Sequence, residues 1–73
     1  MLRITFEREK IGMSKAELSR QAGLDQSLIS KIESGRIKPY PSEIKKISQV
    51  LGLPAEQLLK DVISEEKHFD EKI

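Results

Sequence analysis

Cysteine is absent from this 73-residue chain, and histidine occurs once, at His68. The missing thiols exclude disulfides and thiolate metal sites, and a single histidine forms a zinc site only with help from carboxylates. No apolar run approaches the roughly 20 residues that cross a bilayer, and the first residues lack the basic, apolar and small-residue order of a secretory signal. We therefore expect a soluble, cytoplasmic protein without a metal, a cofactor or a membrane segment.

Catalytic machinery is equally scarce. The chain has no cysteine nucleophile, no glycine-rich phosphate loop and no paired carboxylates at the end of a strand. A chain of this length forms one domain and buries only about 60% of its unfolded surface, which leaves no room for a large substrate cleft. We expect that the protein is not an enzyme.

Charge is unevenly distributed, although the net charge is only +1. Residues 1–60 contain eleven lysines and arginines against seven acidic residues, a net charge of +4, whereas residues 61–73 contain two against five, a net charge of −3. A basic body with an acidic tail suits a surface that faces nucleic-acid phosphates. An ordinary solvated mixture of charges is the alternative, and composition alone does not separate the two.

Glycine and proline divide the chain into five short segments. No segment alternates apolar and polar residues for long, and Glu, Lys, Gln, Leu and Ile are abundant, so helices are favoured over strands. The sequence therefore predicts an all-α fold of five helices. The dividing residues are Gly12, Gly23, Gly35, Pro39, Pro41, Gly52 and Pro54.

Apolar residues recur at helical spacing within each segment and predict its buried face. In the first segment, residues 2–11, Leu2 pairs with Phe6, and Ile4 pairs with Ile11 on an adjoining stripe. The last helix is expected to begin at Pro54. The other expected core positions are Leu18, Ala22, Ile29, Ile32, Ile44, Ile47, Val50, Leu51, Leu58, Leu59, Val62 and Ile63.

The stretch from residue 64 to 73 breaks this pattern, because it is mostly charged. Such a tail is expected to be disordered in isolation or to extend the last helix in a frayed form. Phe69 and Ile73 are four residues apart, which leaves a helix that docks on a partner as an alternative.

Residues 14–34 have the spacing of a helix-turn-helix motif. Ser14 and Glu17 form a capping-box pattern at the start of one helix, and Asp25 is placed to cap the next. Only Ala22, Gly23 and Leu24 separate the two helices, and a short glycine-containing turn is typical of the motif. Other small helical bundles contain a similar corner, so spacing alone does not establish the function.

The second helix of this motif, residues 25–34, has two unlike faces. A helical wheel places Asp25, Leu28, Ile29, Ile32 and Glu33 on one side and Ser27, Ser30, Lys31 and Ser34 on the other, with Gln26 at the border. The outer face has donors for base acceptors and no carboxylate to be repelled by phosphates, which favours a reader of the DNA major groove. An ordinary solvated face is the alternative.

Landmark residues recur in register along most of the chain, from about residue 2 to residue 62. They are Arg8 to Leu18 (REKIGMSKAEL), Ala22-Gly23-Leu24, Ile29 to Gly35 (ISKIESG), Pro39, Ile44, Ile47, Leu51-Gly52-Leu53 and Leu58-Leu59. With this pattern the chain resembles the Cro/repressor-type, XRE-like helix-turn-helix family. The resemblance implies a five-helix, lambda-repressor-like DNA-binding domain over residues 1–63, followed by a charged C-terminal tail, residues 64–73. It also implies that the third helix enters the major groove of double-stranded DNA.

The resemblance further implies roles for single residues. It implies that the base-reading residues are Gln26, Ser27, Ser30 and Lys31. It implies that the phosphate-binding residues are Ser14, Lys15, Arg36, Lys38 and Tyr40. Arg8 and Glu33 match a structural salt bridge between the first and third helices. Lys15 departs from the family, which often has glutamine there, and Ser19 departs from a commoner alanine, which implies a slightly looser helix junction.

Two functions follow as hypotheses. The first is a sequence-specific transcriptional regulator, a repressor that reads two DNA half-sites as a homodimer, because one such module makes a small interface. The second is a protein-interaction module of the same fold, an antitoxin or co-regulator, whose acidic residues 61–73 bind a partner protein.

Overall fold

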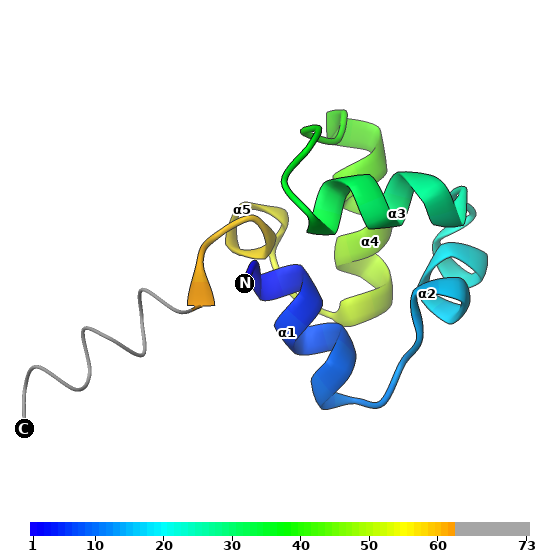
Figure 1. Cartoon of the computed structure of the whole chain (residues 1–73), viewed down its shortest axis with the longest axis horizontal. Coiled ribbons are helices and arrows are strands. Elements are labelled where there is room, and N and C mark those ends of the chain that lie inside the picture. The colour runs from blue at the N-terminus through cyan, green and yellow to red at the C-terminus, as the bar shows by residue number, and fades with distance from the viewer. Residues whose placement is uncertain (63–73) are drawn as a thin grey trace, which may run out of the picture.

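The computed structural model describes residues 1–62, and these form five helices joined by short loops (Figure 1). Within these residues, strand-like pairing is limited to one isolated antiparallel bridge between Leu2 and Asp61. The predicted all-α fold of five helices is thereby confirmed. In chain order the helices are α1 (Arg3–Lys10), α2 (Lys15–Ala22), α3 (Gln26–Glu33), α4 (Pro41–Leu51) and α5 (Ala55–Leu58).

Local side-chain chemistry sets where the middle helices begin. The Ser14 hydroxyl accepts the backbone N–H of Glu17 at 3.0 Å, so it satisfies one of the free N–H groups at the start of α2. At α4, Pro41 occupies the first helical position, where a missing N–H costs nothing. The Glu43 carboxylate reaches back to accept the N–H of Tyr40 at 2.9 Å.

The core lies where the five helices converge. α2 packs against α3 and α4, and α5 packs against α1 and α4. Fully buried isoleucine and leucine side chains are expensive to remove, about 2 to 5 kcal/mol each when cut back to alanine. The core side chains are Ile4, Leu18, Ala22, Ile29, Ile32, Ile47 and Leu58.

The buried face of α1 differs from the prediction. Ile4 is fully buried, but its expected neighbour Ile11 is 58% exposed. The helix ends at Lys10, so Ile11 no longer follows the helical direction of the stripe that begins at Ile4. The next position on that stripe is Arg8, four residues on, which is buried.

The last helix is shorter than predicted. Pro54 is the residue before α5, and the helix ends at Leu58, which leaves Leu59 38% exposed. The backbone after α5 bonds to the start of the chain instead, because Arg3 donates its N–H to the Lys60 carbonyl at 2.8 Å and Val62 donates to the Met1 carbonyl at 2.9 Å. In Figure 1 the N-terminus accordingly lies beside α5. Ile63 and the expected tail, residues 64–73, lie outside the described residues.

None of the helices within residues 1–62 combines the length and the apolar character that a membrane crossing requires.

Candidate nucleic-acid interface

The corner between α2 and α3 fixes the orientation of the third helix. Gly23 has a φ of 69°, a left-handed conformation that glycine adopts without strain, and it lets the chain leave α2 within one residue. Leu18 on α2 and Ile29 on α3 are fully buried on the inner side of the corner. The apolar sides of both helices therefore face the core, and the polar side of α3 faces outward.

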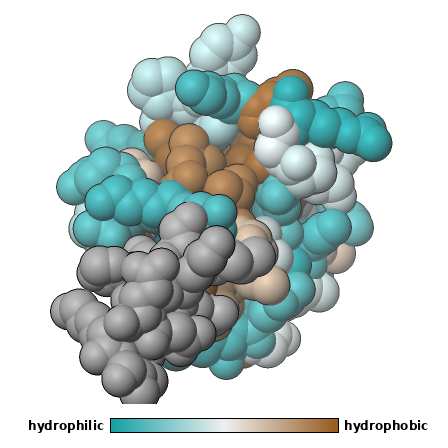
Figure 2. Space-filling view, turned by 60° about the vertical axis from the view of Figure 1, so that its left-hand side comes forward, coloured by the Kyte–Doolittle hydropathy of each residue, from teal (hydrophilic) through white to brown (hydrophobic). Residues whose placement is uncertain are grey.

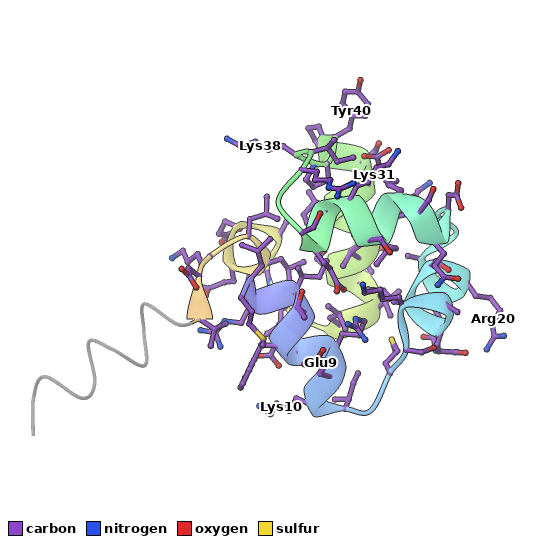
Figure 3. The ribbon with its side chains drawn as sticks, viewed as in Figure 1. Glu9, Lys10, Arg20, Lys31, Lys38 and Tyr40 are labelled. Atoms are coloured by element: carbon purple, nitrogen blue, oxygen red, sulfur yellow. The ribbon has the colours of Figure 1, made fainter. Side chains whose placement is uncertain are left out.

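Three of the four predicted base-reading residues are exposed on this outer side: Gln26, Ser27 and Lys31. In Figure 3, Lys31 lies toward the same end of the molecule as Lys38 and Tyr40, and away from Glu9 and Lys10. The structure thus brings two expected phosphate contacts to the end of the molecule that carries an expected base contact.

The cap of α3 changes the chemistry expected of Ser27. Its hydroxyl donates to one Asp25 carboxylate oxygen at 3.0 Å, and its N–H donates to the other at 3.4 Å. With the hydroxyl proton engaged, Ser27 presents lone pairs and acts toward a base as an acceptor. The sequence interpretation placed Asp25 on the buried side, but it is exposed beside the reading residues because it precedes the first turn of the helix.

Ser30, the fourth predicted reading residue, is half-buried and lies in a shallow groove of about 220 Å³. Lys15 from the start of α2 lines the same groove. A base edge reaches Ser30 only after entering this groove, so Ser30 is less accessible than its position on the helical wheel indicated. The other lining residues are Met1, Thr5, Arg8, Glu9, Glu33 and Ser34, and of these Met1 and Thr5 had no signal in the sequence.

Arg8 and Glu33 form a buried ion pair between α1 and α3. The guanidinium donates two hydrogen bonds to the carboxylate, from Nε at 2.8 Å and from Nη2 at 3.1 Å. Its remaining terminal nitrogen, Nη1, donates to the Met13 carbonyl at 2.7 Å, a contact that the sequence did not indicate. Both side chains are under 10% exposed, so the pair joins the first helix, the loop after it and the end of α3.

This geometry also sets the protonation of Arg8. The hydrogen bond to Glu33 raises the pKa of Arg8, which burial alone would lower, and the nearby charges of Glu33 and Glu9 raise it further. Arg8 therefore remains a cation, and it neutralises a carboxylate that would otherwise stand unpaired at the back of α3.

Cations around the outer side of α3 are in a different situation. Lys15, Lys31, Arg36 and Lys38 have no carboxylate within 4.0 Å among the residues that the structure describes. Lys31, Arg36 and Lys38 are also exposed. No neighbouring carboxylate among the described residues neutralises the field of these cations, so an external anion can pair with them. Phosphate is the anion that a set of lysines and arginines spaced along a surface suits.

The remaining expected phosphate contacts lie at helix starts. Ser14 uses its hydroxyl lone pair to cap α2, and its position at the positive end of that helix favours a nearby anion. Tyr40 is 73% exposed at the start of α4, and its phenol extends away from the protein in Figure 3. Ser19, which departs from the family, satisfies its hydroxyl within α2 by donating to the Ala16 carbonyl at 2.8 Å.

The predicted partner-binding segment, residues 61–73, begins inside the fold. Val62 is only 5% exposed, and Asp61 pairs with Leu2 in the isolated bridge. Val62 is therefore unavailable to a partner protein, and the rest of that segment lies outside the described residues. The part of the chain that the structure describes also contains no cluster of three or more histidine, cysteine or acidic side chains that could hold a metal ion.

Two capped helices joined by a glycine corner, with a polar outer helix flanked by unpaired cations, define a helix-turn-helix protein. The comparison with known families agrees: the chain belongs to the helix-turn-helix domain family, whose sequence model matches residues 3–63. The predicted membership of a Cro/repressor-type, XRE-like family is confirmed.

Two solved structures are similar to this one. The N-terminal DNA-binding domain of SinR from Bacillus subtilis is 33% identical, with a TM-score of 0.74 over 81% of this chain and 87% of that one. The crystal structure of the hypothetical transcription factor NHTF from Neisseria is 35% identical, with a TM-score of 0.75 over 90% of this chain and 74% of that one.

A curated relative is similar over a shorter stretch. A hypothetical transcription factor of Neisseria meningitidis serogroup B is 44% identical over 48 residues, which is 66% of this chain. The present chain spans about 45% of the length of that relative.

Proposed function

We propose that the protein is a sequence-specific DNA-binding transcription regulator that acts as a repressor. The observation that carries the proposal is a set of cations around the polar outer side of α3 that have no carboxylate within 4.0 Å among residues 1–62: Lys15, Lys31, Arg36 and Lys38. The similarity to the DNA-binding domain of SinR and to the Neisseria transcription factors supports the same function. Residues 1–63 form the DNA-binding domain in this proposal.

In the proposed complex, α3 lies in the major groove. Gln26 pairs with an adenine edge, and Lys31 donates to guanine O6 or N7. Ser27 accepts a hydrogen bond from a base amino group while its hydroxyl remains hydrogen-bonded to Asp25. Ser30 contacts the base edge that enters the groove beside it.

Phosphates flank these base contacts on both sides of α3. Ser14 and Lys15 hold one strand at the positive end of α2, and Arg36, Lys38 and Tyr40 hold the other from the loop before α4. A module with about four base contacts makes a small interface, so we propose that two copies read two half-sites about one helical turn apart. Repression then follows because the bound dimer blocks its site for other proteins.

Selection of bound sequences from random duplex DNA tests the function directly. We expect a two-fold related consensus, and affinity for the selected site should exceed that for a scrambled duplex by about a thousandfold or more. Titration of the selected site should saturate at two chains per duplex. A steep salt dependence without a consensus would reduce the function to general polyanion binding.

Single substitutions then test the reading residues. Gln26→Ala or Lys31→Ala should each weaken binding to the selected site by about 1 to 3 kcal/mol and relax the consensus at one position. Gln49→Ala is the matched control, because Gln49 is an exposed helical glutamine on α4 and outside the proposed interface. Equal effects of Gln26→Ala and Gln49→Ala would show that Gln26 does not read a base.

A further inference from the structure

An apolar face lies beside the proposed DNA-binding surface. Ile37, in the loop between α3 and α4, is 40% exposed, and Leu59, directly after α5, is 38% exposed. Figure 1 places this loop and α5 on the same side of the molecule, and Figure 2, turned to bring that side forward, shows apolar side chains gathered there among hydrophilic ones. We call these two residues and their surroundings the Ile37–Leu59 face.

The border of this face is positively charged. Ile37 stands between Arg36 and Lys38, and Leu59 is followed by Lys60. Within residues 1–62, none of these three cations has a carboxylate within 4.0 Å. An occupant that covers the apolar side chains therefore gains if it carries acidic groups at its edge, whereas a second copy would bring like charges together.

The chain itself contains a segment of this chemistry. Residues 63–73 carry four acidic residues against two lysines, and they include the apolar pair Phe69 and Ile73. This segment starts four residues after Leu59, and 11 residues can span up to roughly 36 Å, so its connection permits contact with the face. Charge, apolar content and tethering all point to the same occupant.

We propose that residues 63–73 dock on the Ile37–Leu59 face, with Phe69 and Ile73 against the apolar side chains and acidic groups toward Arg36, Lys38 and Lys60. Because Arg36 and Lys38 are also phosphate contacts in the proposed function, the docked segment competes with DNA for them. This consequence for DNA binding rests on the proposed function, but the docking itself does not.

Tethering makes even a weak contact effective. A short linker gives an effective concentration of about 1 mM, so a contact with a Kd of about 0.1 mM is formed in roughly nine molecules out of ten. If the docked state excludes DNA, the apparent DNA affinity is then lowered about tenfold. Salt should weaken the charged part of the contact.

Methyl NMR spectra of the 73-residue chain test the docking without any DNA. The double substitution Phe69→Ser/Ile73→Ser should shift the methyl signals of Ile37 and Leu59 and leave those of Ile11, an exposed isoleucine after α1, unchanged. The shifts should be the same at all protein concentrations. Unmoved Ile37 and Leu59 signals would overturn the proposal, and shifts of the native signals on dilution would assign the face to a second copy instead.

DNA binding provides the second measurement. At low salt, Phe69→Ser/Ile73→Ser and Ile37→Ser/Leu59→Ser should each raise affinity for a scrambled duplex up to about tenfold, and their combination should raise it no further. Additive effects would overturn the competition. If no variant binds DNA, the proposed function fails, while the methyl shifts still decide whether the segment docks.

Discussion

Two groups of cations in this protein have different surroundings. On α1 and α2, Arg3, Arg8, Lys10 and Arg20 each lie within 4.0 Å of a carboxylate. Around the outer side of α3 and the loop that follows it, Lys15, Lys31, Arg36 and Lys38 have no such partner among the described residues. A cation beside an internal carboxylate has its field partly neutralised, whereas a cation without one is open to an external anion. The net charge of +1 conceals this division.

Breaking the Arg8–Glu33 pair should have the largest effect on the folded state. Arg8→Ala leaves a buried carboxylate without its cation, and Glu33→Ala leaves a buried guanidinium without its acceptor, so each should cost about 3 to 5 kcal/mol of unfolding free energy. Urea denaturation measures the loss, which is a large part of the stability of a small domain. A loss below about 1 kcal/mol would show that the pair behaves like an exposed one.

The double substitution Arg8→Met/Glu33→Leu is the matched control. It removes both charges and keeps apolar volume, so it should recover much of the stability that either single change loses. The pH dependence gives a further check. Because the pKa of Arg8 is raised in the folded state, its contribution is present below the unfolded pKa and is lost only as pH rises through the folded value, in strongly alkaline solution.

Neutralising two cations of the unpaired group should instead affect DNA binding. Arg36→Gln/Lys38→Gln removes two proposed phosphate contacts from each chain, so the slope of log affinity against log salt should become shallower by about 1.8 for each bound chain. At 0.1 M salt this corresponds to roughly 60-fold weaker binding of each chain, on selected and scrambled duplexes alike. Lys10→Gln/Arg20→Gln removes the same charge from the paired group and should leave the slope unchanged. Equal slopes for the two variants would erase the functional distinction between the groups.

Local signals predicted most of the fold. Gly23 ends α2 and Ser14 begins it because these residue types satisfy helix ends within a few positions of sequence. The prediction that Ile11 is buried was wrong because α1 stops one residue before it. The predicted length of the last helix was wrong because the backbone after α5 forms hydrogen bonds with Met1 and Arg3, some sixty residues away in the chain. No local pattern reveals such a distant partner.

In the candidate site, too, some residues were predicted from the sequence and some contacts were not. The helical wheel placed Lys31 on the outer face and Gln26 at its border, and the family resemblance then assigned both to base reading. The Arg8–Glu33 pair joins residues 25 apart and came only from the family resemblance. The groove around Ser30 and the bond from Ser27 to Asp25 were missed, because they depend on how α1 and the cap of α3 sit beside the reading face.

Lys15 is intermediate between the two groups of cations. It lines the groove with Arg8 and Glu33 but has no carboxylate within 4.0 Å among the described residues. Lys15→Gln introduces the amide that similar proteins often have there. For each bound chain we expect a salt slope shallower by about 0.9 and roughly eightfold weaker binding at 0.1 M salt, with the selected consensus unchanged. Native affinity at every salt concentration would show that Lys15 belongs functionally with the paired cations.

Ser14 offers the smallest and most selective change, because it both caps α2 and stands where a phosphate is proposed to bind. Ser14→Ala should lower the unfolding free energy by about 1 kcal/mol through loss of the cap. Ser14→Asp keeps a capping oxygen and a favourable charge for the helix end, so it should retain native stability while repelling the proposed phosphate. Thermal denaturation and DNA affinity measured on both variants separate the two roles. Native DNA affinity in Ser14→Asp would place the phosphate elsewhere and leave Ser14 as a helix cap alone.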